Sequence, residues 1–352
     1  MKTGIAQLPL HHGRAPRWLF EKMVKLSRVI IEVIVFEYGP KEFLRKISDP
    51  FWFQAFGSVL GFDWHSSGVT TTVCGALKEG MKDASYSLGL FFCGGKGGTA
   101  RKTPLHIQTV SERLAINPER LIYASKISAK VDNTCIQDGY SLYHHMFIFT
   151  KDGDWAVVQQ GMNPDTRQAR RYHWLSSTLN SYVCEPHTAV CCDEIHTTLN
   201  MVAQESESSR KVTTLIAKEH PDKIIKETKK ILKMPQRHPV IKLDINPRYF
   251  YKVLLRTYER APNDFENLLS IPGVGPKTIR ALALIGELLY GKSPSFNDPA
   301  RYSFAHGGKD GFPYPVDKKT YNNSILFLED AIKKTKLGDR EKLKLLRRLT
   351  YL

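Results

Sequence analysis

The chain has 352 residues, of which 42% are hydrophobic and 24% are charged. This length fits one large or two ordinary domains. The hydrophobic content is sufficient for packed cores, which excludes a chain without a hydrophobic core. The net charge of +16, with a pI near 9.5, favours a polyanionic partner. Residues 201–352 contain 29 Lys and Arg against 17 Asp and Glu, whereas residues 1–200 contain 22 against 18, so the basic excess belongs to the second part.

The N-terminus and the cysteines indicate the compartment. The first residues are polar and basic, without the apolar stretch of a signal peptide. Residues 29–36 are strongly apolar, but they are too short to cross a bilayer and Glu32 interrupts them. Six cysteines without regular spacing predict no disulfide framework. We therefore expect a cytoplasmic protein that does not associate with membranes.

The first segments of the chain predict helix followed by loops. Residues 16–46 place apolar side chains at steps of three and four, which predicts helix, and Gly39-Pro40 interrupts the pattern. Residues 50–110 are rich in Gly, Ser, Thr and aromatic residues, and we expect this segment to be dense in loops.

A β-hairpin is predicted further along. Two apolar runs within residues 144–161 flank Asp152-Gly153, a strong turn signal. Residues 166–180 are expected to turn helical. The fold class predicted for this part is α/β or α+β.

The character of the chain changes after residue 200, where a polar stretch precedes a lysine-rich helix predicted at 222–233. We expect three units: an α/β domain with a candidate catalytic site at 1–200, a charged linker and helix at 201–240, and an all-α DNA-binding domain at 241–352. The helices of the last unit are predicted at 247–260, 264–270, 276–290, 320–335 and 339–350.

The most informative motif is the stretch from Ser270 to Leu282. Gly273 and Gly275 bracket a tight turn between two apolar helical segments, and Pro276 suits the first position of the second helix. The amide groups that follow would point outward at the positive end of the helix dipole, which suits a phosphate. The motif resembles a helix-hairpin-helix, which grips DNA backbones, and this implies DNA contacts by Gly273, Gly275, Lys277 and Thr278.

The same stretch resembles the hairpin of endonuclease-III-type DNA glycosylases. Their lyase members carry a lysine at the position of Lys277, and the loop that ends at Asp317 is similar to the one that carries the family's aspartate. The resemblance implies that Lys277 could attack a sugar carbon to form a Schiff base while Asp317 stabilises charge or moves protons. The 40-residue gap from Lys277 to Asp317 is about twice that of these glycosylases, and a lysine that contacts phosphate with an aspartate that caps a helix is the alternative.

Two clusters near the start of the chain combine reactive and basic side chains. Asp63 and His65 alternate with aromatic residues, so on a strand they would share one face and could bind a metal ion or act as acid and base. The glycine-rich segment 93–103 lacks the spacing of a P-loop. Its basic residues Lys96, Arg101 and Lys102 suit a nucleic-acid phosphate, and a solvated loop is the alternative.

A third cluster lies between residues 132 and 174. The start of the first hairpin strand and the end of the second are neighbours in an antiparallel pair, so carboxylates, imidazoles and guanidinium groups could converge there. Phosphodiester hydrolysis needs ligands for Mg²⁺ or Mn²⁺, a base and cations. We expect Asp63, His65, Asp138 and His145 as metal or acid–base groups, and Arg170, Arg171 and His173 as groups that stabilise transition-state charge. A face that binds phosphate without chemistry is the alternative.

A fourth pattern consists of Cys184, His187, Cys191 and His196. Alternating thiols and imidazoles suit zinc, but the spacing matches no zinc knuckle, so buried cysteines without a metal are favoured over a zinc site.

Over nearly its full length the chain resembles an uncharacterised family of archaeal and thermophilic bacterial proteins, domain of unknown function 763. The resemblance rests on long strings such as those at 61–68, 94–99, 159–163, 169–174 and 304–311. It implies a role in DNA maintenance, with DNA-repair proteins as further partners. We expect a metal-dependent nuclease that acts on single-stranded or structured DNA. The alternatives are a glycosylase and lyase that uses Lys277 and Asp317, and a DNA-binding repair factor without catalysis.

Overall fold

The computed structural model describes residues 17–61, 68–166, 168–192, 195–231 and 246–300, together with Leu326, Asp330, Lys333, Lys334 and Gly338. Helices come first along the chain, and they are α1 (Arg17–Tyr38), α2 (Pro40–Ile47), α3 (Pro50–Val59), α4 (Gly68–Gly80) and α5 (Ser85–Leu88). A strand and three helices follow, namely β1 (Leu90–Lys96), α6 (Gly98–Arg101), α7 (Thr103–Leu114) and α8 (Glu119–Thr134).

The remaining strands and helices follow in the second half. The strands are β2 (Ile136–Gln137), β3 (Ser141–Thr150), β4 (Trp155–Asn163), β5 (Gln168–Leu175), β6 (Ala189–Cys191) and β7 (Leu199–Asn200), with short 3-10 helices at Ser176–Thr178 and Gln204–Ser206. The last helices are α9 (Glu207–Ile216), α10 (Pro221–Ile231), α11 (Pro247–Arg260), α12 (Phe265–Ser270) and α13 (Pro276–Tyr290). The described part of the chain is therefore a mixed α+β structure.

The centre of the molecule is a five-stranded sheet in the order β1-β3-β4-β5-β6, in which each neighbouring pair is antiparallel. The predicted hairpin is confirmed. Strands β3 and β4 pair along their length, with Phe149 opposite Trp155 next to the turn, and Gly153 in the turn adopts φ 90°. A bulge between Leu142 and His144 shifts the register at the start of β3.

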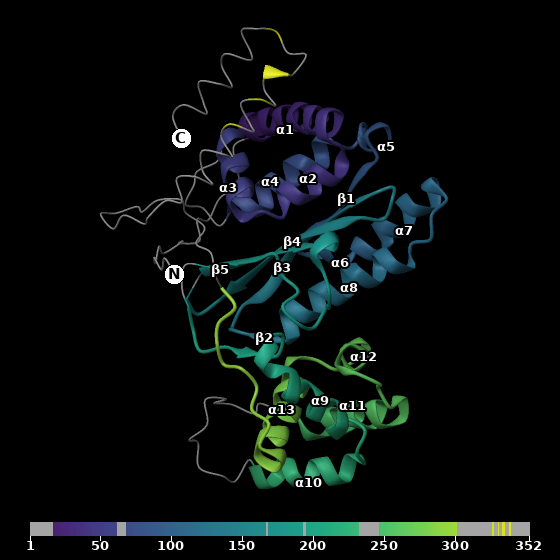
Figure 1. Cartoon of the computed structure of the whole chain (residues 1–352), viewed down its shortest axis with the longest axis vertical. Helices are drawn as coiled ribbons and strands as arrows, with labels where there is room; N and C mark the ends of the chain where they lie inside the picture. Colours follow the sequence, from purple (N-terminus) through teal and green to yellow (C-terminus); the bar gives the residue numbers. More distant parts are fainter. Residues whose placement is uncertain are drawn as a thin grey trace, which may run out of the picture.

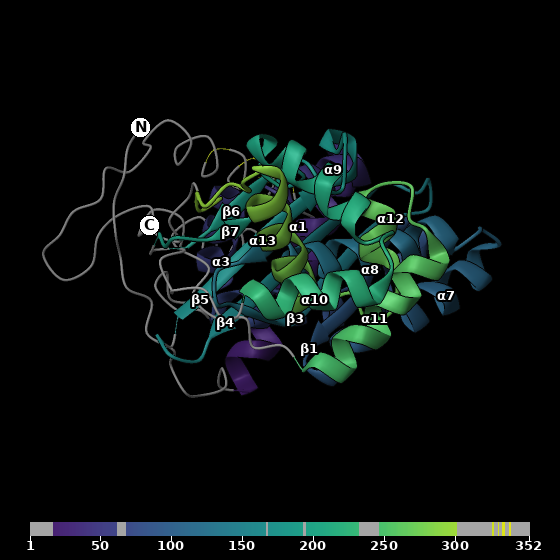
Figure 2. The same cartoon turned by 90° about the horizontal axis from the view of Figure 1, so that it is seen from below.

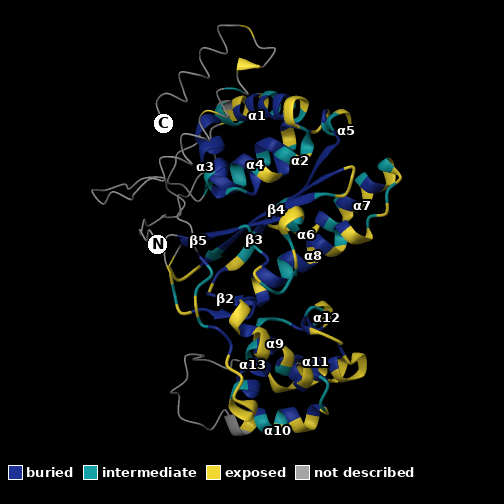
Figure 3. Cartoon of the chain, viewed as in Figure 1, coloured by how far each residue is buried: buried dark blue, intermediate teal, exposed yellow. Residues whose placement is uncertain are grey.

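Both faces of the sheet are covered by helices (Figure 1). Phe147 and Phe149 point toward α7 and α8, whereas Met146 and Ile148 point toward α1–α4, and these alternating sets belong to two separate hydrophobic cores. Strands buried on both faces are apolar along their length, and Figure 3 shows the sheet as almost entirely buried.

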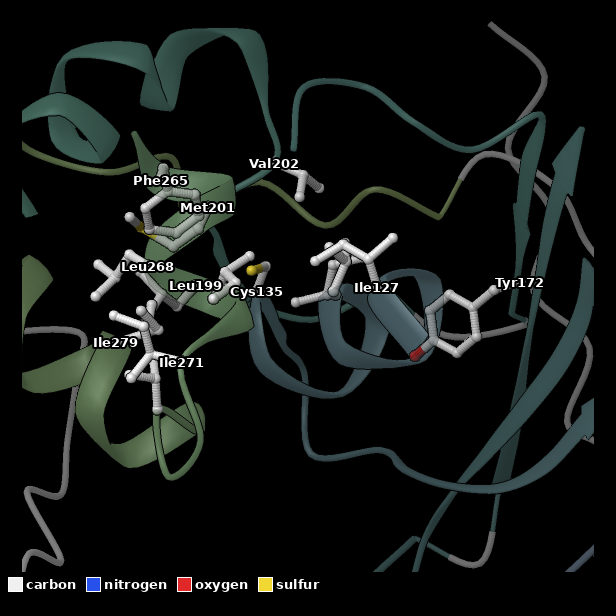
Figure 4. Packing of buried hydrophobic residues seen from close by; sticks show 14 of the residues in the cluster. Ile127, Cys135, Tyr172, Leu199, Met201, Val202, Phe265, Leu268, Ile271 and Ile279 are labelled. Carbon is white, nitrogen blue, oxygen red and sulfur yellow. The ribbon is translucent and has the colours of Figure 1, made fainter. Parts of the chain in front are cut away.

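The core below the sheet continues into the C-terminal helices. One cluster of buried side chains runs from Tyr172 on β5 through Ile127 and Cys135 to Leu268 and Ile279 on α12 and α13 (Figure 4). Seen from below, α10, α11 and α13 lie in front of the sheet and α8, and of these three helices α13 contacts α8 (Figure 2). The segment predicted as a linker contributes α9 and α10, which pack on α13 and α11.

Several predicted elements are confirmed and two are wrong. The helices expected near 16–46 and at 247–260, 264–270 and 276–290 are present. The helix expected at 166–180 is instead strand β5, because pairing with β4 and β6 overrides the local pattern.

The described part of the segment 50–110 consists mostly of helices α3 to α7 and strand β1 rather than loops, because many of its glycines and hydroxyl residues lie within helices and strands. The predicted helices at 320–335 and 339–350 lie almost entirely outside the described residues. The few described positions there include Asp330 and Lys334, whose side chains contact Tyr38 on α1.

Candidate functional site

A glycine-rich segment runs from the end of β1 through α6 to the start of α7 and forms one wall of a cavity. Gly94, Gly95 and Gly97 adopt φ 109°, 143° and 58°. A Cβ on Gly94 would lie 2.1 Å from the carbonyl oxygen of His145, so only glycine fits beside β3. The Gly97 amide then donates to the Tyr143 carbonyl at 2.7 Å, and the chain turns into the short helix α6 and on into α7.

The cavity has a volume of about 650 Å³ and lies between this glycine-rich segment, the middle of α8 and the start of β3. Three of its lining residues carry cationic side chains, namely Arg101, Lys126 and Lys130. Burial lowers the pKa of Lys130. The cavity therefore presents positive charge in a partly desolvated setting, which suits an anion.

A chain of hydrogen bonds leads from this cavity into the core. Ser125 and His145 both line the cavity, and the Ser125 Oγ lies 2.9 Å from His145 Nε2. His145 Nδ1 lies 2.9 Å from Gln159 Oε1, and Gln159 Nε2 donates to Asp132 Oδ2 at 2.7 Å. All four residues are buried, and their side chains come from α8, β3 and β4.

The Asp132 end of this hydrogen-bond chain determines which group donates and which accepts in each of its bonds. Asp132 also accepts from Trp174 Nε1 at 3.0 Å and from His187 Nε2 at 2.5 Å, so its oxygens face three donors. The Gln159 amide nitrogen must therefore face Asp132 and its carbonyl must face His145. A carbonyl accepts only, so His145 carries its proton on Nδ1 and presents the lone pair of Nε2 to Ser125.

The pKa values of these groups follow from burial. Desolvation lowers the pKa of His145 to about 4, opposed by its hydrogen bond to Gln159, so the imidazole is neutral at pH 7. Burial raises the pKa of Asp132, and the interactions with His187 and Trp174 oppose this.

Asp138 and Arg170 belong to a different and closed network on the same side of the sheet. Arg170 Nη1 donates to Asp138 Oδ2 and Arg170 Nη2 donates to Asp298 Oδ2, both at 2.7 Å, and the side chains have no exposed area. Tyr172 and the Tyr140 amide also donate to Asp138. Both residues lie in a sealed ion-pair network, and neither lines the cavity.

Arg171 and His173 lie on the opposite face of the sheet, because successive residues of a strand alternate. Arg171 Nε donates to His173 Nε2 at 2.9 Å, and Arg171 also stacks over the Phe53 ring at 4.4 Å. His173 Nδ1 donates to the Ile47 carbonyl at 3.2 Å. The expectation that these residues converge with Asp138 and His145 is therefore wrong, and its cause is the helix predicted in place of β5.

Two members of the predicted metal set, Asp138 and His145, are among the described residues. Asp63 and His65 lie outside them, and so does Asp317 of the alternative lyase pair. Asp138 is bonded to Arg170 and Tyr172, and both ring nitrogens of His145 have protein partners. Among the described residues no group of three or more His, Cys, Asp and Glu could hold a metal ion.

The thiols and imidazoles considered for zinc have separate environments. His187 bonds to Asp132, and the His196 amide donates to Asp298 at 2.9 Å. Cys191 is buried in β6, and Cys184 is half-buried without a disulfide.

The second candidate surface surrounds the turn between α12 and α13. Gly273 adopts φ 94°, and a Cβ there would lie 3.1 Å from Val253 and 3.3 Å from Arg256 Nη1, both on α11. Gly275, the N-cap of α13, has φ −137°, and a Cβ there would lie 3.9 Å from the Gly273 carbonyl oxygen, an ordinary contact distance. Lys277 in the first turn is exposed, whereas Thr278 is buried.

Helix α11 adds an exposed basic and aromatic face beside this turn. Arg256 Nη1 donates to the Pro272 carbonyl at 3.3 Å, which fixes α11 against the turn. The exposed cationic and tyrosine residues of this helix are Arg248, Tyr249, Tyr251, Lys252, Arg256, Tyr258 and Arg260. Only Glu259 carries negative charge on α11.

A single side chain connects the turn to α8. Gln137 Nε2 donates to the Pro276 carbonyl at 2.8 Å and to the Thr134 carbonyl at 3.0 Å, while Arg280 Nε donates to Gln137 Oε1 at 2.6 Å. The start of α13 is thereby held at the C-terminal end of α8. The same end of α8 contributes Asn133 to the cavity.

The comparison with family models accounts for most of the sequence. Residues 4–316 match the family described as "Protein of unknown function (DUF763)". The chain belongs to the DUF763 family. No curated protein and no solved structure matches it. Among the described residues of this DUF763 protein, no helix is both long and apolar enough to cross a membrane.

Sequence reasoning found part of the cavity and missed the rest. Arg101 lines it as expected of the glycine-rich loop, whereas Lys96 lies 5.6 Å from the centre of the Tyr143 ring and Lys102 caps α7, both outside the lining. Ser125, Lys126 and Lys130 were missed. The one available signal was the spacing of the two lysines, four residues apart on a helix and hence on one face.

Proposed function

We propose that this DUF763 protein binds DNA through a helix-hairpin-helix formed by α12 and α13 and processes the phosphodiester backbone. The observation that carries the proposal is the turn at Gly273, where a positive φ and close contact with α11 set exposed cations around the start of α13. This arrangement supports an all-α DNA-binding unit in the C-terminal part, fused through its core to an α+β part with the chemistry.

The first turn of α13 supplies amide groups that have no intrahelical partner, at the positive end of a 15-residue helix. Gly275 leaves the backbone open to close approach, and Lys277 adds a cation. These groups recognise phosphate and not bases. The exposed tyrosines of α11 are suited to stacking on unpaired bases, which favours single-stranded or structured DNA over plain duplex.

The cavity beside α8 is the site that we assign to the backbone chemistry. Gln137 holds the start of α13 against the end of α8, and the cavity lies along the same helix. A strand held at the hairpin would follow α8 toward Lys130, Lys126 and Arg101. This proposal moves the chemistry away from Asp138 and Arg170, whose charges neutralise each other.

The exposure of Lys277 favours a phosphate contact over Schiff-base chemistry. A lysine that attacks a sugar carbon needs a desolvated amine that loses its proton, and this side chain lies at the surface.

The test measures binding and cleavage with the full chain. Labelled single-stranded, duplex and flapped DNA are titrated at several salt concentrations, and cleavage is followed with Mg²⁺, Mn²⁺ or EDTA. We expect Lys277→Ala to weaken binding of every sequence and to reduce the salt slope by about one. Lys41→Ala, an exposed lysine on α2 across the sheet, is the matched control and should change neither.

Absence of DNA affinity at low salt would overturn the proposal. Equal effects of Lys277→Ala and Lys41→Ala would show that the hairpin is not the binding site, because they would indicate that net charge alone attracts the DNA.

A further inference from the structure

We propose that Ser125 is a nucleophile that attacks the phosphorus of a phosphodiester, with His145 as its general base and Gln159 and Asp132 as positioning residues. The inference deepens the proposed function and rests on it for the identity of the substrate, the DNA backbone.

The geometry is that of an activated hydroxyl. A serine becomes nucleophilic when a neutral imidazole nitrogen lies within hydrogen-bond distance of its oxygen and a third group orients the ring. Ser125 Oγ lies 2.9 Å from His145 Nε2, and Gln159 Oε1 holds the opposite ring nitrogen at 2.9 Å. Asp132 fixes the amide of Gln159, so the unprotonated nitrogen is the one that faces Ser125.

The cavity gives this pair both access and a preferred substrate charge. Ser125 and His145 lie in its wall, and Arg101, Lys126 and Lys130 line the same space. Gly97 and Gly98 also line this space, and among the described residues no atom lies within 4 Å of the position that a Cβ would take on either glycine. Cations around a hydroxyl suit the negative charge that builds up on the phosphoryl oxygens during displacement.

Burial keeps His145 unprotonated in the free protein, and a bound substrate anion would make it a stronger base. Desolvation holds His145 neutral at pH 7, so its lone pair can accept a proton. A phosphodiester anion in the cavity would raise the pKa of this imidazole, because a nearby negative charge favours the protonated ring. The imidazolium is then stabilised when the substrate is bound.

The proposed reaction has two balanced steps. In the first, the bond from Ser125 Oγ to phosphorus forms, the hydroxyl proton passes to His145 Nε2, and the bond from phosphorus to the leaving oxygen breaks as that oxygen takes the proton. In the second, water attacks phosphorus, His145 takes its proton, and the Oγ–phosphorus bond breaks as Ser125 regains the proton. No oxidant, reductant or further reactant is needed.

The main experiment labels the serine in the folded, full-length protein. A fluorophosphonate probe reacts with an activated serine by forming an oxygen–phosphorus bond and releasing fluoride. We expect one adduct, located on Ser125 by mass spectrometry, and hydrolysis of bis(p-nitrophenyl) phosphate and DNA. Ser125→Ala should abolish labelling and lower hydrolysis at least 100-fold without loss of DNA affinity.

A matched control lies one turn further along α8. Ser128 is also buried, but its Oγ bonds to the Ser125 carbonyl and the residue does not line the cavity. Ser128→Ala should keep labelling and hydrolysis. Ser125→Cys, which keeps a nucleophile of similar size, should retain covalent capture if Ser125→Ala fails to fold.

The positioning role has its own readout. In Asp132→Asn the Gln159 amide is free to turn, so His145 loses its fixed acceptor and the pKa of the ring falls. We expect kcat to drop with little change in KM, and the acid limb of the pH–rate profile to move to lower pH. A residue that only stabilises the fold would not move that limb.

The outcomes separate this inference from the proposed function. DNA cleavage that persists in Ser125→Ala, or DNA binding without any adduct or hydrolysis, would overturn the assignment of Ser125 as nucleophile. Neither result would contradict DNA binding by the α12–α13 hairpin. Labelling and small-substrate hydrolysis without DNA affinity would support the nucleophile and overturn the assignment of DNA as substrate.

Discussion

At the scale of single residues, three histidines in the sheet are held neutral by burial. Desolvation lowers the pKa of His144 to about 3 and of His145 to about 4, and it lowers the pKa of His173 well below its usual value. His145 and His173 have hydrogen-bond partners, whereas both ring nitrogens of His144 are buried and have no partner among the residues that the structure describes. These residues make the fold sensitive to acid.

We expect the free energy of unfolding to fall as the pH drops from about 6.5 toward about 4. In this range the unfolded chain binds protons that the folded histidines refuse, so stability rises with pH. One pKa unit corresponds to 1.36 kcal/mol, so the shift at His145 alone would lower the free energy of unfolding by about 3 kcal/mol between pH 7 and pH 4.

Urea denaturation at a series of pH values tests this with His144→Gln as the comparison. The raised pKa values of Asp132 and Asp138 make stability fall as the pH rises, which opposes the effect of the histidines. Comparison with the variant isolates the contribution of the His144 imidazole. Its stability should depend less steeply on pH than that of the parent. Parallel curves would contradict the prediction.

The two glycines of the α12–α13 turn predict different outcomes for the same change. Gly273→Ala should cost about 1–2 kcal/mol, because alanine is strained at φ 94° and its Cβ would press on Val253. Gly275→Ala should leave stability within about 0.5 kcal/mol, since φ −137° is ordinary and the nearest atom is 3.9 Å away.

DNA affinity should separate the two variants in a second way. Gly275→Ala places a methyl group where the backbone would approach a phosphate, so it should weaken binding while the protein stays folded. Denaturation curves and DNA titrations on the same preparations check both parts. Unchanged affinity in Gly275→Ala would place the DNA contact elsewhere.

At the scale of elements, strand β5 carries charged side chains to both faces of a buried sheet. Arg170 meets Asp138 and Asp298 on the α8 side, and Arg171 meets His173 on the α3 side. Because the segment around Asp298 follows α13, the ion pair also joins the end of the C-terminal helices to the sheet.

We expect Asp138→Asn to destabilise the protein by about 3–5 kcal/mol. It removes the charge of one of the two carboxylates that bond Arg170 at 2.7 Å, and it weakens the buried hydrogen bonds that Arg170 and Tyr172 donate to this side chain, although Asp298 still pairs with Arg170. Glu207→Gln breaks an exposed pair with Lys211 on α9 and should change the stability far less, because solvent screens this pair. Chemical denaturation of both variants decides; similar losses would mean that Asp138 is not buried as described.

At the scale of the whole molecule, the C-terminal helices and the sheet share one core. Buried residues of α12 and α13 belong to the same cluster as those of β4 and β5. Tyr123 on α8 donates to Glu266 on α12, and Gln137 bonds to α13. Parts that bury each other's apolar surface should not unfold separately.

We therefore expect a single unfolding transition. All five tryptophans lie within the first 174 residues, so their fluorescence reports on the sheet and the helices before it, whereas far-UV circular dichroism also reports on α9 to α13. The two signals should change at the same urea concentration. Two separate midpoints would show that the C-terminal helices form an independent domain.

The sequence determined the elements that depend on local signals. Helices at 247–260, 264–270 and 276–290 follow from apolar periodicity and terminal glycines, and the β3–β4 hairpin follows from Asp152-Gly153, because caps and tight turns are encoded by neighbouring residues. The glycine turn and its exposed lysine were also readable.

Only the tertiary structure decided how the polar residues are grouped. The segment around Arg170 and Arg171 became a strand through pairing with β4, and alternation then sent the two arginines to opposite faces. Ser125 and His145 meet although they are twenty positions apart in the sequence and lie on different elements, α8 and β3. Such contacts depend on sheet register and on which face each helix covers, and these are set by long-range packing that no local pattern specifies.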